Sequence, residues 1–181
     1  MPGFSRSSLA VLAVLGAMLA AGCNNDARTL NCPAAAILAD ISTRPVLKPG
    51  AIPTDPAAVL YTVAVTDIDT SCVLDPRLGV TRSDVELTFR ATRPPSGQAA
   101  HYVVPYFLAI NQGERVINKR VFNVVIDFAP GASSVIVKTP IDNTELKLEN
   151  GHLPLDYQFL AGMQLSADEQ AYLKAVSRYT P

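Results

Sequence analysis

The chain has 181 residues, with 15 lysines and arginines against 16 aspartates and glutamates, so its formal net charge is −1. This balance leaves no basic footprint of the kind that nucleic-acid-binding proteins carry, and we expect no nucleic-acid partner. The length that remains after a leader fits one domain, and no apolar run after the leader is long enough to span a bilayer.

The first residues have the features of a secretory signal peptide. Arg6 lies before an apolar run from Leu9 to Ala21, which is shorter than the roughly 20 residues that a membrane-spanning helix needs. The run ends in Leu-Ala-Ala-Gly directly before Cys23, and this pattern resembles the lipobox of bacterial lipoproteins. The alternative is a buried cysteine at the end of an N-terminal helix of the folded domain.

The lipobox resemblance implies a processed and acylated N-terminus. Residues 1–22 would be removed as a lipoprotein signal peptide, and Cys23 would take a diacylglyceryl group on its sulfur and a fatty acyl chain such as palmitate on its amine. Several acyl chains, at about 0.8 kcal/mol per buried CH2, make a durable anchor in a bilayer. The protein would then be held in the cell envelope facing the periplasm, and Asn24 in place of Asp favours the outer membrane over the inner membrane.

Residues 23–31 form the expected lipidated tether, and residues 32–181 the expected domain. Cys32 and Cys72 are the two cysteines that remain after Cys23. In an oxidising compartment they have one possible intramolecular pairing, and a disulfide closing a loop of about 40 residues would contribute roughly 3–4 kcal/mol. A metal site would need more cysteine or histidine ligands, and a nucleophilic cysteine would need a histidine partner.

The next two stretches carry weaker signals. Residues 32–42 fit either a short helical turn after Pro33 or a short extended segment. Residues 44–56 hold four prolines, which forbid a long helix or a central strand, so we expect a loop or a polyproline-like edge there.

From Val59 onward, apolar and polar residues alternate with the period of β-strands. In residues 83–94, Val85, Leu87, Phe89 and Ala91 share one face and polar residues share the other, which indicates a half-buried strand. Further strands are expected at residues 59–74, 101–110, 115–130, 134–140, 144–149 and 155–166, with Pro105 placing an edge or a bulge in the strand at 101–110.

The spacing of the apolar residues departs from the strand period only near the C-terminus. Ser166 and Glu169 have the spacing of a capping box, and the residues that follow fit one short helix ending near Arg178. Turn-punctuated strands with no helix between them predict an all-β fold, an antiparallel β-sandwich of the immunoglobulin-like kind with a short C-terminal helix. A closed barrel is the alternative.

Candidate chemistry is sparse. The two histidines, His101 and His152, offer little material for a catalytic triad, and no nucleophile elbow, phosphate-binding loop or zinc-protease motif is present. Asp67 and Asp69 lie two apart on one side of a strand, with Asp75 beyond Cys72, and are weak candidates for calcium ligands. The favoured interpretation is that these acids solvate the end of the strand, so we expect no metal and no cofactor.

Two further groups of side chains have a structural interpretation. The basic pairs Arg90 with Arg93 and Lys119 with Arg120 are expected on solvated strand faces, although they also have the chemistry to bind lipid or glycan phosphate. The aromatic residues at strand spacing are expected in the core, and these are Tyr102, Tyr106, Phe107, Phe122, Phe128, Tyr157 and Phe159. The chain has no tryptophan, which weakens a sugar-stacking interpretation.

The mature part resembles a group of uncharacterised lipoproteins of alphaproteobacteria. The stretches that carry the resemblance are Cys32–Asp40, Ala58–Cys72, Phe89–Gly97 and Val104–Arg115, and it covers most of residues 28–181. It implies a single exported domain with paired cysteines and no known activity. We therefore expect a membrane-anchored envelope lipoprotein acting as a non-enzymatic binding or structural module, with the bilayer and possible envelope proteins as partners. A periplasmic module for a small ligand or glycan is the alternative, and an exported hydrolase is the third hypothesis.

Overall fold

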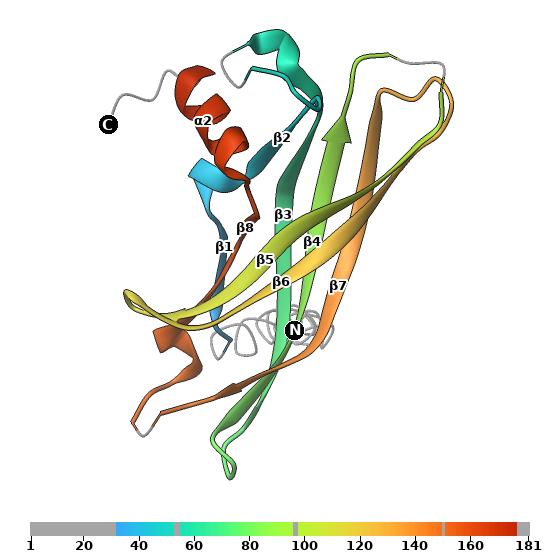
Figure 1. Cartoon of the computed structure of the whole chain (residues 1–181). Coiled ribbons are helices and arrows are strands. Elements are labelled where there is room, and N and C mark those ends of the chain that lie inside the picture. The colour runs from blue at the N-terminus through green and yellow to red at the C-terminus, as the bar shows by residue number, and fades with distance from the viewer. Residues whose placement is uncertain (1–31, 53–54, 96–97, 150, 177–181) are drawn as a thin grey trace, which may run out of the picture.

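The structure, a computed structural model, describes residues 32–52, 55–95, 98–149 and 151–176, which form two four-stranded sheets packed face to face (Figure 1). The strand orders are β1-β8-β5-β6 and β2-β3-β4-β7, and β1 is parallel to β8 while all other pairs are antiparallel. The strands are β1 Ala34–Ile37, β2 Thr43–Leu47, β3 Val59–Asp75, β4 Val80–Thr92, β5 Ala100–Gln112, β6 Arg115–Phe128, β7 Ser134–Lys147 and β8 Tyr157–Met163, followed by the helix α2 Ala167–Val176. The predicted β-sandwich with a short C-terminal helix is confirmed, and the two separate sheets rule out the closed barrel for the described residues.

The core lies between the sheets and follows the predicted alternation. On β4, Val85, Leu87, Phe89 and Ala91 are buried, while the intervening Arg90 is exposed. The inner faces of β5, β6 and β8 close the core from the other side with Tyr106, Val124, Ile126, Phe128, Tyr157 and Phe159. The hydrophobic effect on these alternating side chains therefore accounts for the pairing of the two sheets.

A bulge in β3 exchanges the two faces of that strand. Val63 and Val65 point into the core, and the register with β4 shifts between Val65 and Asp67. Beyond the bulge the inward positions are even-numbered, so that Cys72 pairs with the buried Ser83. The extra residue thus turns Asp67 towards solvent and brings Cys72 to the inner side.

Prolines are accommodated where no partner strand needs their missing N–H. Pro45 lies in β2 and Pro140 in β7, and both strands are edges of their sheet. The expected loop or edge at residues 44–56 therefore begins as an edge strand, and the two short strands expected at 134–140 and 144–149 are one strand with a register shift near Asn143. Proline at a sheet edge leaves no ladder donor unpaired, so Pro140 does not end β7.

Pro105 lies in β5, which is an inner strand and not an edge strand. The pairing of β5 with β8 begins only at Tyr106, and just beyond it the Pro105 carbonyl accepts a hydrogen bond from the Gln164 N–H at 3.1 Å. Pro105 thus lies just beyond the end of the β5–β8 ladder, where only Gln164 follows β8. The expected edge was wrong, while β5 does contain a register shift, at Ile110 and Asn111 and not at Pro105. The ending of β8 beside Pro105 explains why a proline is tolerated there.

Residues 32–42, which fitted either a helical turn or an extended segment in the sequence, contain one of each. Residues 34–37 form β1, and a 3₁₀ turn follows at Ala39–Ile41. Leu38 extends the pairing by donating its N–H to the carbonyl of Ala161 at 2.9 Å. This turn carries Ile41 across the outer face of β8, where it lies beside Phe107 at the position of Gly162.

Phe107 is buried, as expected, but it is not part of the core cluster between the sheets. It lies on the outer face of β5, where the Lys119 ammonium lies 4.0 Å from its ring centroid. The prediction of a core position is therefore corrected for this residue. Because nearly every residue of this part of β5 is apolar, alternation could not tell its inner face from its outer face.

The predicted capping box starts α2. The Ser166 N–H donates to Glu169 Oε2 at 2.7 Å, and the Glu169 N–H donates to Ser166 Oγ at 3.2 Å. Glu169 is also buried and pairs with Arg44 of β2 at 2.8 Å, which fixes the helix to the sandwich. The expected helix end near Arg178 lies outside the described residues.

Candidate functional site

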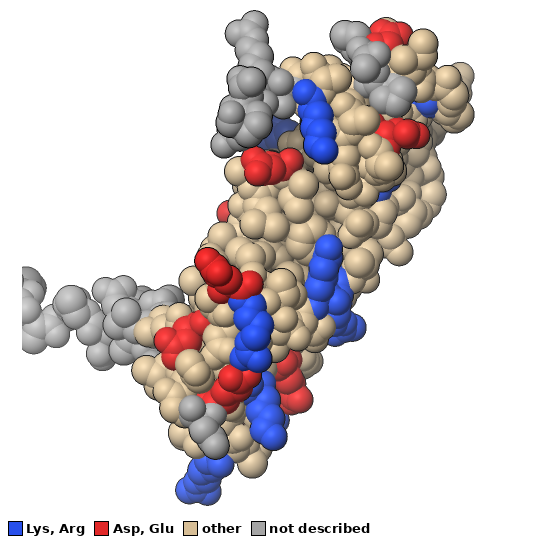
Figure 2. All heavy atoms as spheres, turned by 60° about the vertical axis from the view of Figure 1, so that its left-hand side comes forward, with Lys and Arg blue, Asp and Glu red and all other residues tan. Residues whose placement is uncertain are grey.

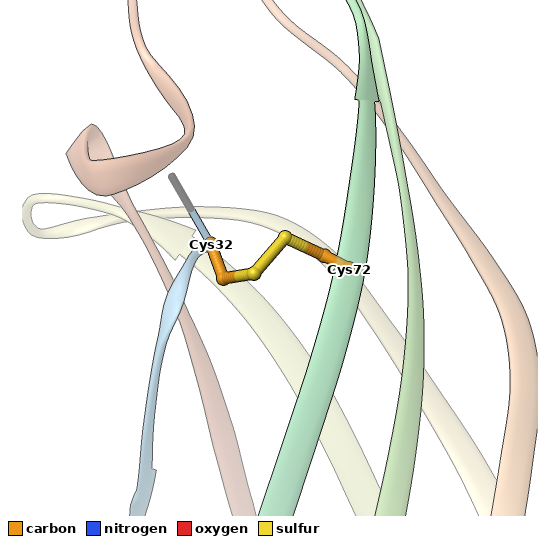
Figure 3. Close-up of a disulfide and its surroundings, with 2 residues drawn as sticks. All are labelled: Cys32 and Cys72. Atoms are coloured by element: carbon orange, nitrogen blue, oxygen red, sulfur yellow. A yellow bond between two sulfur atoms is a disulfide. The ribbon is translucent and has the colours of Figure 1, made fainter. Parts of the chain in front are cut away.

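The expected lipidation site, Cys23, lies outside the described residues, but the point where the chain joins the domain is described. Cys32, just before β1, forms a disulfide with Cys72 of β3, with an S–S distance of 1.99 Å (Figure 3). The predicted pairing is confirmed. Because β1 has four residues and one neighbouring strand, this bond is the covalent link that holds the start of the domain to the opposite sheet.

Three loops gather at the same end of the sandwich as this bond, and we call this region the disulfide end. They are the β3–β4 turn at residues 76–79, the β5–β6 turn at 113–114 and the described parts of the β7–β8 connection at 148–149 and 151–156 (Figure 1). The Leu148 N–H donates to the carbonyl of Gly79 at 2.8 Å, which joins the first loop to the third. Arg115 pairs with Glu149, which joins the second loop to the third.

Two carboxylates organise the backbone of these loops. Asp75 Oδ1 accepts the N–H groups of Arg77 at 3.0 Å and Leu78 at 3.2 Å. Asp156 Oδ2 accepts the Leu153 N–H at 2.8 Å and lies 3.2 Å from His152 Nδ1. The backbone hydrogen bond from Leu153, with the histidine as a second cause, lowers the pKa of Asp156 below its usual value.

The loops of the disulfide end expose large apolar side chains. Val73 is 73% exposed, and Leu78 and Leu153 are each 62% exposed. Leu155 and Val116, in the same region, are also more than half exposed. Sequence reasoning missed these residues. Turns favour Gly, Pro, Asn, Asp and Ser, so the leucine in the Asp-Pro-Arg-Leu-Gly turn is unusual and could have indicated an exposed apolar side chain.

The inner face becomes polar towards this end. Thr81 and Ser83 continue the inward-facing row of β4 and are fully buried, and neither hydroxyl has a hydrogen-bond partner among the described residues. Thr144 of β7 lies opposite Ser83 in the β4–β7 ladder, and its buried hydroxyl also lacks a hydrogen-bond partner among the described residues. A depression of about 470 Å³ lies beside the disulfide, and its polar lining includes Arg82, Asp84 and Asn143.

The weak metal candidates, Asp67 and Asp69, lie on the outer face of β3 and are exposed. Asp69 pairs across the strands with Glu86, and Lys138 Nζ lies 2.5 Å from Glu86 Oε1. The hydrogen bond that Lys138 donates to Glu86 raises the pKa of Lys138, with smaller contributions from Asp69 and Asp67. An ammonium group thus already compensates these acids, and among the described residues no group of three or more His, Cys, Asp or Glu side chains is arranged to hold a metal ion.

Each histidine pairs with an aspartate on the surface. His101 Nδ1 lies 2.6 Å from Asp127 Oδ1 on the neighbouring strand, and His152 pairs with Asp156. Within the described ranges neither imidazole is hydrogen-bonded to a serine, threonine or cysteine. The expectation that the protein is not an enzyme remains a prediction.

Three of the four basic residues singled out in the sequence pack on aromatic rings, while Arg90 is exposed on β4. Arg93 lies 4.4 Å from the Phe128 ring centroid and donates to three backbone carbonyls, while Arg120 lies 5.1 Å from the ring of Phe122. Together with Lys119 over Phe107, these contacts give the cations a packing role.

No helix in the described part of the chain has the length and apolarity that crossing a membrane requires. No protein-family model, curated protein or solved structure matches the chain.

Proposed function

We propose that the chain is a lipid-anchored lipoprotein of the cell envelope that acts as a non-enzymatic binding or structural module. The observation that carries the proposal is the Cys32–Cys72 disulfide. Disulfides persist in oxidising compartments such as the periplasm and are rare in the cytosol. This supports export, and export is what the apolar leader and the lipobox before Cys23 predict independently.

The anchor would be the acylated Cys23, inserted in the periplasm-facing leaflet of the outer membrane in preference to the inner membrane. Residues 24–31 would link it to Cys32, where the disulfide transfers any pull on the tether to the long strand β3. The short strand β1 would therefore not have to bear that load alone. The sandwich would stand at the membrane face as a rigid module and bind an envelope protein.

Metabolic labelling with an alkyne fatty acid in the producing bacterium tests the anchor. The wild-type chain should be labelled and the Cys23→Ser variant should not. The matched control is the double variant Cys32→Ser with Cys72→Ser, which removes the other two cysteines and should keep the label. Label on Cys23→Ser, or none on the wild type, would contradict the proposal.

Crosslinking in intact cells tests the binding role. Under the proposal, the acylated protein gives a discrete crosslinked species with an envelope protein. An exported hydrolase would instead show turnover in a broad substrate screen, and the loss of that turnover in His101→Ala would contradict the non-enzymatic role.

The alternative, a module for a small ligand or glycan, has one observation in its favour. The depression beside the disulfide has a volume within the range of about 300–1,000 Å³ typical of ligand pockets, and it has polar lining residues. Arg82 already pairs with Glu145, and Asp84 accepts the Asn143 N–H, so a ligand would have to compete with these contacts. Native mass spectrometry showing a co-purified small molecule that Asp84→Ala abolishes would favour this alternative.

A further inference from the structure

We propose that the disulfide end lies against the phospholipid bilayer and that Leu78, Leu153 and Leu155 insert their side chains into its interfacial region. The inference rests on the proposed anchor at Cys23 and goes beyond it. The anchor alone would leave the domain free to face the membrane with any surface, whereas the loops assign one orientation.

The position of the disulfide determines which end faces the membrane. An extended chain spans at most about 3.3–3.6 Å per residue, so residues 24–31 hold Cys32 within roughly 30 Å of the acylated residue. The β3–β4 hairpin extends past Cys72 through Val73–Asp75 and its turn, so its tip lies farther along the strand direction than the disulfide itself. The turn with Leu78 is therefore well placed to touch the surface in which the acyl chains are embedded.

The most exposed of the large apolar side chains lie mainly at this end, although strand faces elsewhere also carry exposed valines and an isoleucine. Of the large apolar residues that the structure describes, four are more than 60% exposed, and three of them, Val73, Leu78 and Leu153, lie here. The fourth, Ile52, lies in the loop after β2 at the opposite end of the sandwich. Leucines at loop tips lose water contact only if another surface covers them, and a bilayer interface offers such a surface without a specific pocket.

The loops hold these leucines in place before any contact with lipid. Asp75 fixes the backbone of the turn that carries Leu78, and Asp156 fixes the backbone at Leu153. The hydrogen bond from Leu148 to Gly79 keeps the two leucine-bearing loops side by side. Insertion would therefore cost little further ordering of the chain.

The charges at this end suit a zwitterionic surface. Glu149 is neutralised by Arg115, and the carboxylates of Asp75 and Asp156 are engaged by loop N–H groups. Figure 2 shows basic and acidic side chains intermixed towards the lower end of the molecule, with no extended patch of one sign in that view. The described charges at this end are of both signs and include the exposed Arg77 on the β3–β4 turn, so apolar insertion, and not attraction to a strongly charged surface, carries the contact.

Depth-dependent quenching on the full acylated protein tests the inference. Leu78→Cys, Leu153→Cys and the matched control Ile52→Cys each add one surface thiol, because Cys32 and Cys72 are bonded and Cys23 is acylated in the proposed mature form. Each variant is labelled with an environment-sensitive nitrobenzoxadiazole probe and reconstituted in phosphatidylcholine vesicles with or without doxyl-labelled lipid. We expect the emission at positions 78 and 153 to fall at least two-fold with doxyl lipid and the emission at position 52 to stay unchanged.

Intact mass spectrometry of the same samples separates the two proposals. An acylated protein whose probes at 78 and 153 are quenched no more than the probe at 52 would overturn the membrane-facing orientation and leave the anchor intact. A protein without acyl groups would overturn the anchor itself. As a second variant, Leu78→Ser with Leu153→Ser and a reporter thiol at Val116→Cys should show weaker quenching than the same reporter on the wild-type loops, and equal quenching would contradict insertion through the leucines.

Discussion

Removing the disulfide should lower the stability of the domain by a predictable amount. The bond joins residues separated by 40 positions, and the loop-entropy model gives a contribution of about 4 kcal/mol for a loop of that length. The double variant Cys32→Ser with Cys72→Ser avoids leaving a free thiol. Because Cys72 faces inward beside Ser83, serine at both positions places hydroxyls in surroundings that are already polar.

Urea denaturation of the oxidised wild type and the double variant measures the effect. With a slope near 2 kcal/mol per molar urea, which is typical for small domains, the midpoint should fall by about 2 M. Val73→Ser, an exposed position next to the bond, is the matched control and should change the free energy of unfolding by less than about 0.5 kcal/mol. A loss below about 1 kcal/mol in the double variant, with an unchanged slope, would refute the reasoning that this bond secures the start of the domain.

Three further predictions concern the helix, the core and the outer face of β8. Glu169→Ala should destabilise the domain by about 3–5 kcal/mol, because it leaves the Arg44 guanidinium partly buried without its carboxylate and also removes the capping box, and thermal denaturation measures this. Burial raises the pKa of Tyr106 to about 12, so from pH 10 to 12 the unfolded chain releases this proton and the folded chain does not. Stability should therefore fall with rising pH by about 2 kcal/mol over that window, as denaturation at each pH would show. Gly162→Ala should cost about 1–3 kcal/mol in urea denaturation, since its methyl group would lie 2.9 Å from Phe107 Cζ.

Each of these has a matched control. Glu145→Ala breaks an exposed pair with Arg82 and should cost less than about 1 kcal/mol, so equal losses at positions 145 and 169 would contradict the role of the buried pair. Tyr106→Phe should flatten the slope between pH 10 and 12, and an unchanged slope would assign it to other groups. Phe107→Leu should partly rescue Gly162→Ala, and simply additive losses would show that the ring is not the obstacle.

The alternation of apolar and polar residues was sufficient to predict which side chains are buried in strands with one solvent-exposed face. β4 follows its sequence pattern residue by residue from Val85 to Ala91, because a half-buried strand must separate apolar from polar side chains with period two. The capping box at Ser166 was also readable, since it depends on residues three apart. The cysteine pairing followed from simple counting once the leader cysteine was set aside.

The rest depends on contacts that local patterns do not contain. The bulge after Val65 reverses the faces of β3. Such an extra residue cannot be recognised from the alternation of apolar and polar residues alone, because it is defined by the register with β4. Arg44 and Glu169 are 125 positions apart, so only the fold brings them together. The two leucine-bearing loops come together through the hydrogen bond from Leu148 to Gly79, and Arg115 with Glu149 adds the β5–β6 turn; both contacts arise from the order of the strands in the two sheets.

Intact mass spectrometry of the protein extracted from solubilised envelopes tests the central claim most directly. The account predicts a chain that begins at Cys23 and carries the added mass of a diacylglyceryl group and an amide-linked acyl chain, with Cys32 and Cys72 oxidised. A chain that retains residues 1–22, or one that begins at residue 23 without acyl groups, would contradict the lipid anchor and the orientation at the membrane that depends on it.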